Sequence, residues 1–224
     1  MTFTCNFCKK EFAKETSIAV HMCEPKRRRM EKDERGVQLG FQAYIKFYET
    51  MQGSAKLKTF DDFADSAYYK AFVKFGRYCL VIRAINPARF MDWLLKHNKK
   101  LDRWCSDQLY TEYLIEYVRV EHVDDALARS IEWSIAWGEE HDAPPHDCLR
   151  YGNTNVICYA LTSGRISPWC IYNSDSGIEF LSSLTEDQIA MIWPYIESDV
   201  WQKKFKDYPA DVEYVKDILK KAGW

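Results

Sequence analysis

One short spacing of cysteine and histidine constrains this chain more than any other feature. Cys5 and Cys8 are separated by two residues, and His21 and Cys23 follow within the first two dozen residues. Two cysteines at this spacing lie on one tight turn and present both thiolates to the same side of a metal ion. The segment is too short to fold around an apolar core alone, so it needs a metal. The four side chains therefore predict a tetrahedral zinc site.

Two apolar residues stand between the predicted ligands. Phe12 follows Cys8 by four positions, and Ile18 precedes His21 by three. This arrangement resembles the C2H2 zinc-finger family over residues 1–24. The resemblance implies a β-hairpin and a short helix, with Phe12 and Ile18 packed between them and Zn²⁺ as the cofactor.

The chain departs from this family at the fourth ligand. The family places a second His or Cys three to five residues after the first His, and here Pro25, Lys26 and Arg27 stand there. Cys23 is the remaining candidate. Residues two apart on a helix face nearly opposite ways, so the chain must leave helical geometry directly after His21. Pro25 also biases Glu24 away from the helical region. We expect three thiolates, one imidazole and a truncated helix.

The same resemblance indicates where nucleic acid would be contacted. The family's base-reading positions fall on Lys14, Thr16, Ser17 and Val20, and only Lys14 suits a strong guanine contact. A single finger reads about three base pairs, so phosphate contacts must supply most of the affinity. The alternative is that the basic run after the finger is a solvated linker. The predicted nucleic-acid contacts, with DNA favoured over RNA, are Lys9, Lys10, Lys14, Ser17, Lys26, Arg27, Arg28 and Arg29.

The rest of the chain reads as helical. Helical periodicity dominates from Val37 onward, and Ala143-Pro144-Pro145 is the strongest break. We expect an all-α, two-lobed body behind a small ββα finger. Several helix starts and ends are legible, including Gly53, Asn86-Pro87, Ser106, Ser167-Pro168, Thr185 with Gln188, and Pro209. The expected domains are a finger at 1–24, a charged linker at 25–36, and helical domains at 37–142 and 146–224.

Composition limits the class of protein. The chain has 224 residues, 47% of them hydrophobic, with a formal net charge of −2. This is enough to bury a core, and it provides no global attraction to nucleic acid. There is no signal peptide and no apolar stretch of roughly 20 residues, so no membrane partner is expected. The longest apolar run, Tyr78 to Ile82, predicts a buried helix segment. The five cysteines outside the finger are scattered as in a reducing compartment, which predicts a cytoplasmic protein, or one of the host cytoplasm if viral.

The sequence carries no recognisable catalytic motif. It lacks a phosphate-binding glycine loop, a nucleophile elbow and a paired E-x-x-H set, so we expect neither an enzyme nor a small-molecule substrate. A polar segment, Glu139 to Cys148, could be a second metal site or an active site such as that of a nuclease, but a polar interdomain loop is the simpler interpretation. Aromatic and basic residues interleave around Tyr44–Tyr48 and Tyr68–Lys74. They predict either a base-stacking face or, more simply, core.

The order of elements past residue 37 is similar to that of the helicase-loading proteins of T-even-type bacteriophages. The similarity rests on Ala43 to Tyr48, Ser66 to Lys70 and the helix-turn from Tyr159 to Ser167. It implies an all-α accessory protein that binds forked or single-stranded DNA and recruits a helicase in DNA replication. Our hypothesis is a non-enzymatic nucleic-acid-binding accessory protein, of phage replication or of transcription, whose body docks a protein partner. The alternative is a protein-interaction or structural module of a phage assembly, in which zinc is purely structural.

Overall fold

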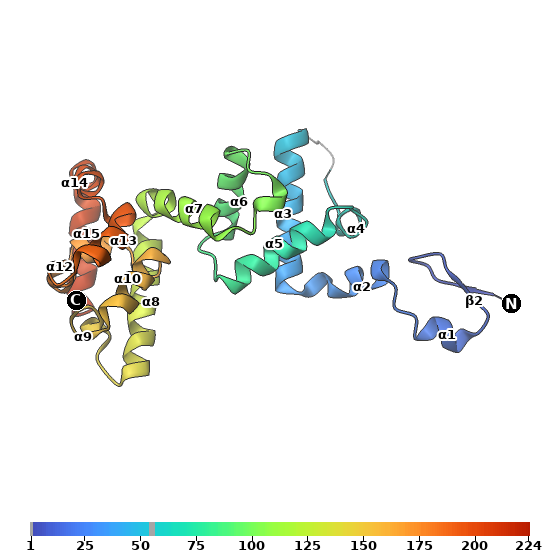
Figure 1. The fold of residues 1–224 in the computed structure, drawn as a ribbon, viewed down its shortest axis with the longest axis horizontal. Helices are drawn as coiled ribbons and strands as arrows, with labels where there is room; N and C mark the ends of the chain where they lie inside the picture. Colours follow the sequence, from blue (N-terminus) through green and yellow to red (C-terminus); the bar gives the residue numbers. More distant parts are fainter. Residues whose placement is uncertain (1, 54–56) are drawn as a thin grey trace. The chain divides into compact units, whose positions relative to one another are not determined.

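The computed structural model describes residues 2–53 and 57–224 (Figure 1). Its regular structure is helical apart from one two-stranded hairpin, which confirms the predicted all-α fold with a small ββα segment. The chain divides into two compact units, Met1–Leu109 and Tyr110–Trp224, called unit 1 and unit 2. Every described helix is too short or too polar to cross a bilayer.

Unit 1 begins with the hairpin. Strand β1 (Phe3–Thr4) pairs antiparallel with β2 (Glu11–Phe12), which places Phe3 opposite Phe12. Helix α1 (Glu15–Ala19) follows and has only five residues. The truncated finger helix expected from the sequence is therefore confirmed.

The charged segment after the finger differs from the sequence-based expectation. Where a solvated connector is predicted, the chain forms α2 (Glu24–Met30) and the 3₁₀ turn η1 (Glu31–Asp33). Pro25 sits in the first turn of α2, where its missing N–H costs no hydrogen bond. Glu24 is the first residue of α2, so the bias against helix expected before a proline does not hold here. Helix α2 packs on α4 (Phe60–Ala64), so this segment belongs to the body of unit 1.

Two helices of unit 1 cross with their backbones nearly touching. They are α3 (Arg35–Gln52) and α5 (Tyr69–Val81). A Cβ added to Gly76 would stand 2.0 Å from the carbonyl oxygen of Gly36, and one added to Gly40 would stand 2.7 Å from the carbonyl oxygen of Phe72. Only glycine allows such an approach. The spacing of Gly36 and Gly40, four residues apart on one helix face, is the sequence signal for it.

An aromatic core fills the rest of unit 1. Phe63, Phe72, Phe75 and Trp104 are fully buried, and the Phe75 and Trp104 rings lie 5.1 Å apart at 72°, a favourable edge-to-face geometry. The predicted stop at Gly53 is confirmed, because this residue caps α3 in the left-handed conformation. The other helical elements are α6 (Pro87–Lys96), capped by Asn86, and η2 (Leu101–Arg103).

The apolar run from Tyr78 to Ile82 is only partly buried. Cys79 is buried, but Val81 is 81% exposed and Leu80 is exposed as well. The prediction of a buried segment is wrong here because the run lies in the last turn of α5, where consecutive residues point in different directions.

Unit 2 is a set of helices whose starts were largely legible in the sequence. Ser167 caps a helix at its predicted position, Asn153 caps another, and Thr185 with Gln188 forms the predicted capping box. Three helices of unit 2 were not predicted from the sequence: α9, α12 and α14. The elements are α7 (Asp107–Val120), α8 (Val123–His141), η3 (Pro145–Asp147), α9 (Cys148–Tyr151), α10 (Thr154–Thr162), α11 (Pro168–Tyr172), α12 (Asp175–Ser182), α13 (Glu186–Ile196), α14 (Ser198–Asp207) and α15 (Pro209–Lys221).

The core of unit 2 combines tryptophans with a buried ion pair. Trp169 and Trp201 are buried with ring centroids 5.8 Å apart. Beside them the Glu121 carboxylate accepts hydrogen bonds from Arg129 Nη2 at 2.7 Å and from Ser167 Oγ at 3.1 Å. Burial raises the pKa of Glu121, and Arg129 opposes that shift. The pair ties the start of α8 to the turn before α11.

The predicted domain boundary at residues 143–145 lies within unit 2. There η3 packs on the end of α8. The assignment of domains to 37–142 and 146–224 stays a prediction.

Candidate metal centre

The four predicted ligands meet at one point. Cys5 Sγ lies 3.9 Å from Cys23 Sγ, and Cys8 Sγ lies 3.2 Å from His21 Nε2. All four donor atoms fall within 4.8 Å of one another. A tetrahedral zinc ion with ordinary bond lengths has S–S and S–N edges of about 3.8 and about 3.6 Å, so the cluster matches a zinc-sized sphere. A disulfide, with sulfurs about 2 Å apart, is excluded.

The turn that carries the first two ligands places their thiols in different environments. The Cys5 N–H donates to the Lys10 carbonyl at 2.9 Å, and the Lys9 N–H donates to the Cys5 carbonyl at 2.9 Å. Hydrogen bonds from the backbone of Cys8, and then of Phe7, lower the pKa of Cys5 to about 7 against the effect of burial. For Cys8, the backbone of Lys10 lowers the pKa, but burial and the neighbouring thiols Cys5 and Cys23 outweigh it and raise the value. A cation at the centre would favour thiolate at both.

The other two ligands lie outside helical backbone. Helix α1 ends at Ala19, so His21 follows the helix rather than standing on its face, and its N–H donates to the Ile18 carbonyl at 3.1 Å. Cys23 is extended, with φ −89° and ψ 161°, and is the residue directly before α2. This solves the spacing problem of two ligands two residues apart. It also fixes the start of α2 to the metal centre.

A small apolar contact supports the cluster. The Phe12 ring packs on the His21 ring with centroids 4.7 Å apart, and Ile18 is half-buried beside the hairpin. The donor set of three thiolates and one imidazole is closed, with no position left for water or substrate. In zinc proteins, closed donor sets of this kind are structural sites. Across residues 2–53 and 57–224 it is the only cluster of this kind.

The predicted nucleic-acid contacts of the finger itself are exposed. Lys9, Lys10, Lys14 and Ser17 all face solvent, and Lys10 Nζ lies 5.7 Å from the centre of the Phe12 ring. Helix α1, however, spans only about 7.5 Å at the usual rise per residue. A helix of this length cannot contact several base pairs. The exposed lysines of the finger could therefore contact phosphate groups rather than a base sequence.

The basic run after the finger divides into two kinds of side chain. Arg28 donates to the Ala64 carbonyl at 2.8 Å and to Glu24 at 2.6 Å, and its guanidinium covers the Tyr69 ring. Arg29 donates to Asp61 and Asp65, both at 2.8 Å. These two arginines hold α2 against the body. Their assignment as nucleic-acid contacts stays a prediction, and the structure gives them a stabilising role that the sequence did not indicate.

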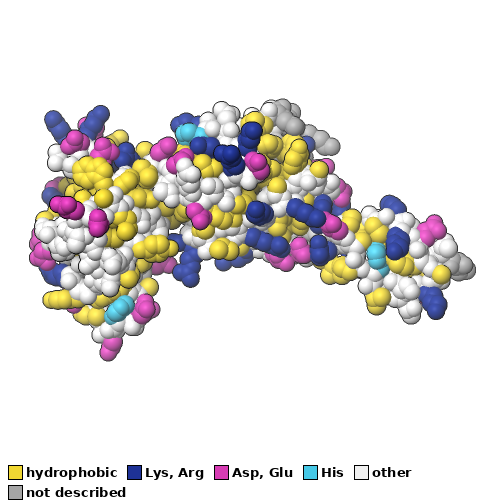
Figure 2. All heavy atoms as spheres, viewed as in Figure 1, with side chains coloured by type: hydrophobic (Ala, Val, Ile, Leu, Met, Phe, Trp, Pro, Cys, Tyr) yellow, Lys and Arg dark blue, Asp and Glu magenta, His cyan; other side chains and the backbone are white. Residues whose placement is uncertain are grey.

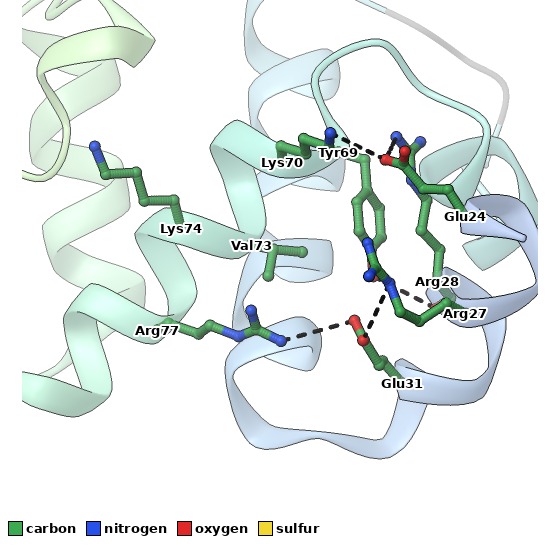
Figure 3. A pocket seen from close by; sticks show the side chains of 9 residues that line it. All are labelled: Glu24, Arg27, Arg28, Glu31, Tyr69, Lys70, Val73, Lys74 and Arg77. Carbon is green, nitrogen blue, oxygen red and sulfur yellow. Dashed lines mark hydrogen bonds and ion pairs between the residues drawn. The ribbon is translucent and has the colours of Figure 1, made fainter. Parts of the chain in front are cut away.

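Lys26 and Arg27 are more available. Lys26 Nζ reaches the His21 carbonyl at 3.3 Å, and Arg27, whose side chain is 58% exposed, makes one loose ion pair with Glu31 at 3.7 Å. Across a shallow groove stand three cations on α5, Lys70, Lys74 and Arg77 (Figure 3). Lys70 and Lys74 belong to the aromatic-basic segment Tyr68–Lys74 identified in the sequence, whereas Arg77 was not selected there. The i, i+4, i+7 spacing, which places all three on one helix face, is the signal that would have found Arg77.

Charge is divided sharply between the two units. Residues 1–109 contain 21 Lys and Arg against 13 Asp and Glu, a formal charge of +8, whereas residues 110–224 contain 10 against 20, a charge of −10. The whole-chain value of −2 hides this division. Figure 2 shows many Lys and Arg side chains gathered over the helices of unit 1.

The polar segment from Glu139 to Cys148 does not assemble a site. His141 stacks on Trp137 with ring centroids 4.7 Å apart, and His146 lies against Gly223 near Asp147. Cys148 is buried, and burial raises the pKa of its thiol to about 12, which makes it a poor nucleophile. The predicted polar interdomain loop is mostly helical: it comprises the end of α8, η3 and the start of α9, all within unit 2.

The interleaved aromatic residues of unit 1 are mainly core. Tyr44, Tyr69 and Phe72 are buried, while Tyr68 is 54% exposed. The simpler of the two interpretations therefore describes most of these rings.

Neither the family models, the curated proteins nor the solved structures compared with this chain give a match. Nothing beyond the quoted segments therefore supports the resemblance to helicase-loading proteins.

Proposed function

We propose that this chain is a non-enzymatic, zinc-binding accessory protein that holds DNA through unit 1 and a protein partner through unit 2. The observation that carries the proposal is the division of charge, +8 against −10, along one chain of nearly neutral sum. A strongly basic unit attracts the phosphate backbone, and an acidic unit is repelled by it.

Zinc is the ion that the cluster fits best. Three thiolates and an imidazole form a soft donor set with tetrahedral spacing, which favours zinc over magnesium or calcium. In this proposal, Cys5, Cys8, His21 and Cys23 hold the ion. When bound, it supplies stability and no chemistry of its own. The exposed lysines of the finger and exposed Arg27 of α2 then supply the phosphate contacts.

The protein partner is proposed from exposed rings on unit 2. Helices α10 and α13 pack against each other, and they leave Tyr159 71% and Trp193 47% exposed. Exposed Tyr and Trp are typical anchors of protein interfaces. If unit 2 alone carries the function, the chain is the protein-interaction module of a larger assembly. That second candidate requires no nucleic acid.

Fluorescence anisotropy of labelled single-stranded, duplex and forked DNA tests the proposal. Measured at several salt concentrations, the affinity for duplex should fall with a log–log slope of about −0.9 per phosphate contact. A Cys5→Ser, Cys8→Ser variant should bind more weakly than the wild type. Absence of binding to every DNA at low salt would refute the DNA role and leave the interaction module, for which pull-down with Trp193→Ala as the control is the assay.

Fork structure separates a general DNA-binding role from helicase loading. Preference for the fork over both duplex and single strand would add the replication role that the resemblance implies. Equal binding to all three would limit the proposal to backbone recognition.

A further inference from the structure

A groove of about 440 Å³ runs between α2 and α5 in unit 1 (Figure 3). Its walls carry five cationic side chains, Arg27 and Arg28 from α2 and Lys70, Lys74 and Arg77 from α5. Two carboxylates, Glu24 and Glu31, also line it. The groove therefore has a surplus of three positive charges in a concave surface, where their fields add.

Arg28 is firmly paired with Glu24 at 2.6 Å, but the other cations of the groove are more exposed. Lys70 pairs with Glu24 at 3.2 Å and Arg77 with Glu34 at 2.9 Å, all with side chains 40–74% exposed. Such exposed pairs contribute little to stability, so an incoming anion can replace them. Within the described residues, Lys74 makes no hydrogen bond or ion pair, although its side chain lines the groove.

The spacing along α5 suits a repeating anion. Lys70, Lys74 and Arg77 stand on one helix face over about 10 Å of axial rise. Val73 lies on the same wall between them and is buried. A row of cations with an apolar side chain between them fits a chain of phosphates joined by sugars. It is longer than one isolated phosphate needs.

We propose that the α2–α5 groove binds the sugar–phosphate backbone of a nucleic-acid strand, with Lys70, Lys74, Arg77 and Arg27 as the phosphate contacts. This deepens the proposed function and depends on it. Because Tyr69 is buried beneath Arg28, the groove offers no exposed ring for base stacking. Binding is therefore insensitive to sequence.

The position of α2 links the groove to the finger. One wall of the groove begins directly after Cys23, the fourth ligand of the metal centre. A strand held in the groove would thus lie beside half-buried Lys26 at the same end of α2. The finger and the groove form one continuous phosphate-binding surface.

The test compares two double variants of equal charge in the full-length, zinc-loaded chain. Lys70→Gln with Lys74→Gln removes two groove cations, and Lys96→Gln with Lys100→Gln removes two exposed cations elsewhere in unit 1. With labelled single-stranded and duplex DNA, the groove variant should lose about tenfold or more in affinity and about two contacts from the salt slope. The control variant should stay within about twofold of the wild type.

A variant that binds DNA more tightly distinguishes loss of a contact from loss of the fold. Glu31→Gln removes a carboxylate that faces Arg27 and Arg77, so it should tighten DNA binding by about threefold, which a damaged fold would not do.

Equal losses of affinity in both double variants would overturn the groove proposal in favour of an effect of net charge alone. Unchanged affinity in the groove variant, with wild-type binding intact, would overturn the groove and leave the proposed DNA role. No wild-type binding would overturn both. Competition by millimolar inorganic phosphate at constant ionic strength would show a site for small phosphates and overturn the backbone proposal.

Discussion

The two units use charge in opposite ways. In unit 2, several of the ten cationic side chains bind groups within the same unit. Arg119 contacts Glu197, Arg129 contacts Glu121, and Lys204 Nζ donates to the Arg119 carbonyl. In unit 1, most cations face solvent, including Arg27, Lys70, Lys74 and Arg77 of the α2–α5 groove. The comparison teaches that a net charge near zero can result from two strongly charged halves with separate tasks.

The units also differ in what stabilises them. Unit 1 combines the cysteine–histidine cluster and helices brought together at glycines with a buried aromatic core. Unit 2 combines an apolar core that includes two buried tryptophans with a buried ion pair. The perturbations below should therefore act on one unit and leave the other intact.

Removing the metal should have the largest effect, confined to the finger. Binding of a structural zinc ion is worth about 10–16 kcal/mol in small finger peptides, so a strong chelator should unfold residues 1–23. Amide resonances of that segment should collapse to random-coil positions in a ¹H–¹⁵N spectrum, while those of unit 2 stay in place. Cys105→Ser, a cysteine outside the cluster, is the control and should leave the spectrum of the finger unchanged.

Removing Arg129 should have the largest effect on unit 2. In Arg129→Met the Glu121 carboxylate would remain buried without its cation, at a cost of about 3–5 kcal/mol in the free energy of unfolding. Adding Glu121→Gln should restore most of that loss, because the uncompensated charge is gone. Urea denaturation measures both. A loss below about 1 kcal/mol would mean that the pair is not desolvated.

Adding one methyl group to Gly76 should loosen unit 1. The new Cβ in Gly76→Ala meets the Gly36 carbonyl oxygen at 2.0 Å, so α3 and α5 must move apart. Overpacking of this kind costs about 1–3 kcal/mol, and the contact with backbone argues for the upper end. Thermal unfolding monitored by circular dichroism measures it. Lys74→Ala, on an exposed position of the same helix, should change stability by less than about 0.5 kcal/mol.

Lowering the pH should release the metal through the thiolates. The pKa of Cys5 lies at about 7, below its ordinary value, so the contribution of its thiolate is complete at higher pH and is lost as the pH falls through 7. Below that point each pH unit should weaken zinc affinity at least tenfold, as protons compete for the ligands. Competition with a chromophoric chelator between pH 5 and 8 measures it. An affinity that is flat over this range would contradict three thiolate ligands.

Sequence reasoning reached the metal ligands and most helix boundaries because both depend on local chemistry. The Cys5-x2-Cys8 turn, the helix start at Asn86-Pro87 and the Thr185 capping box are decided by neighbours a few residues away. Helix α2 was missed because its stability comes from outside the segment. Arg28 and Arg29 reach Ala64, Asp61 and Asp65, more than thirty residues along the chain.

The groove was missed for the same reason. Lys70, Lys74 and Arg77 share a helix face that the sequence could reveal, but their meeting with Arg27 depends on the packing of α2. The division of charge was also legible in the sequence. The net charge of the whole chain hides it, because the boundary between the two units, after Leu109, is visible only in the folded structure.

The smallest predicted effect concerns a residue whose backbone the sequence did not flag. Lys9 has φ +60° in the turn between the metal ligands, a conformation that costs a residue with a Cβ about 1 kcal/mol relative to glycine. Lys9→Gly should therefore tighten zinc binding about fivefold. Lys9→Ala is the matched control, because it loses the same cation but keeps the strain. Zinc competition separates the two variants, and DNA binding by Lys9→Ala measures the worth of the charge alone. If both variants bind zinc equally, the turn stores no strain, and the metal centre of unit 1 is stabilised by its ligands alone.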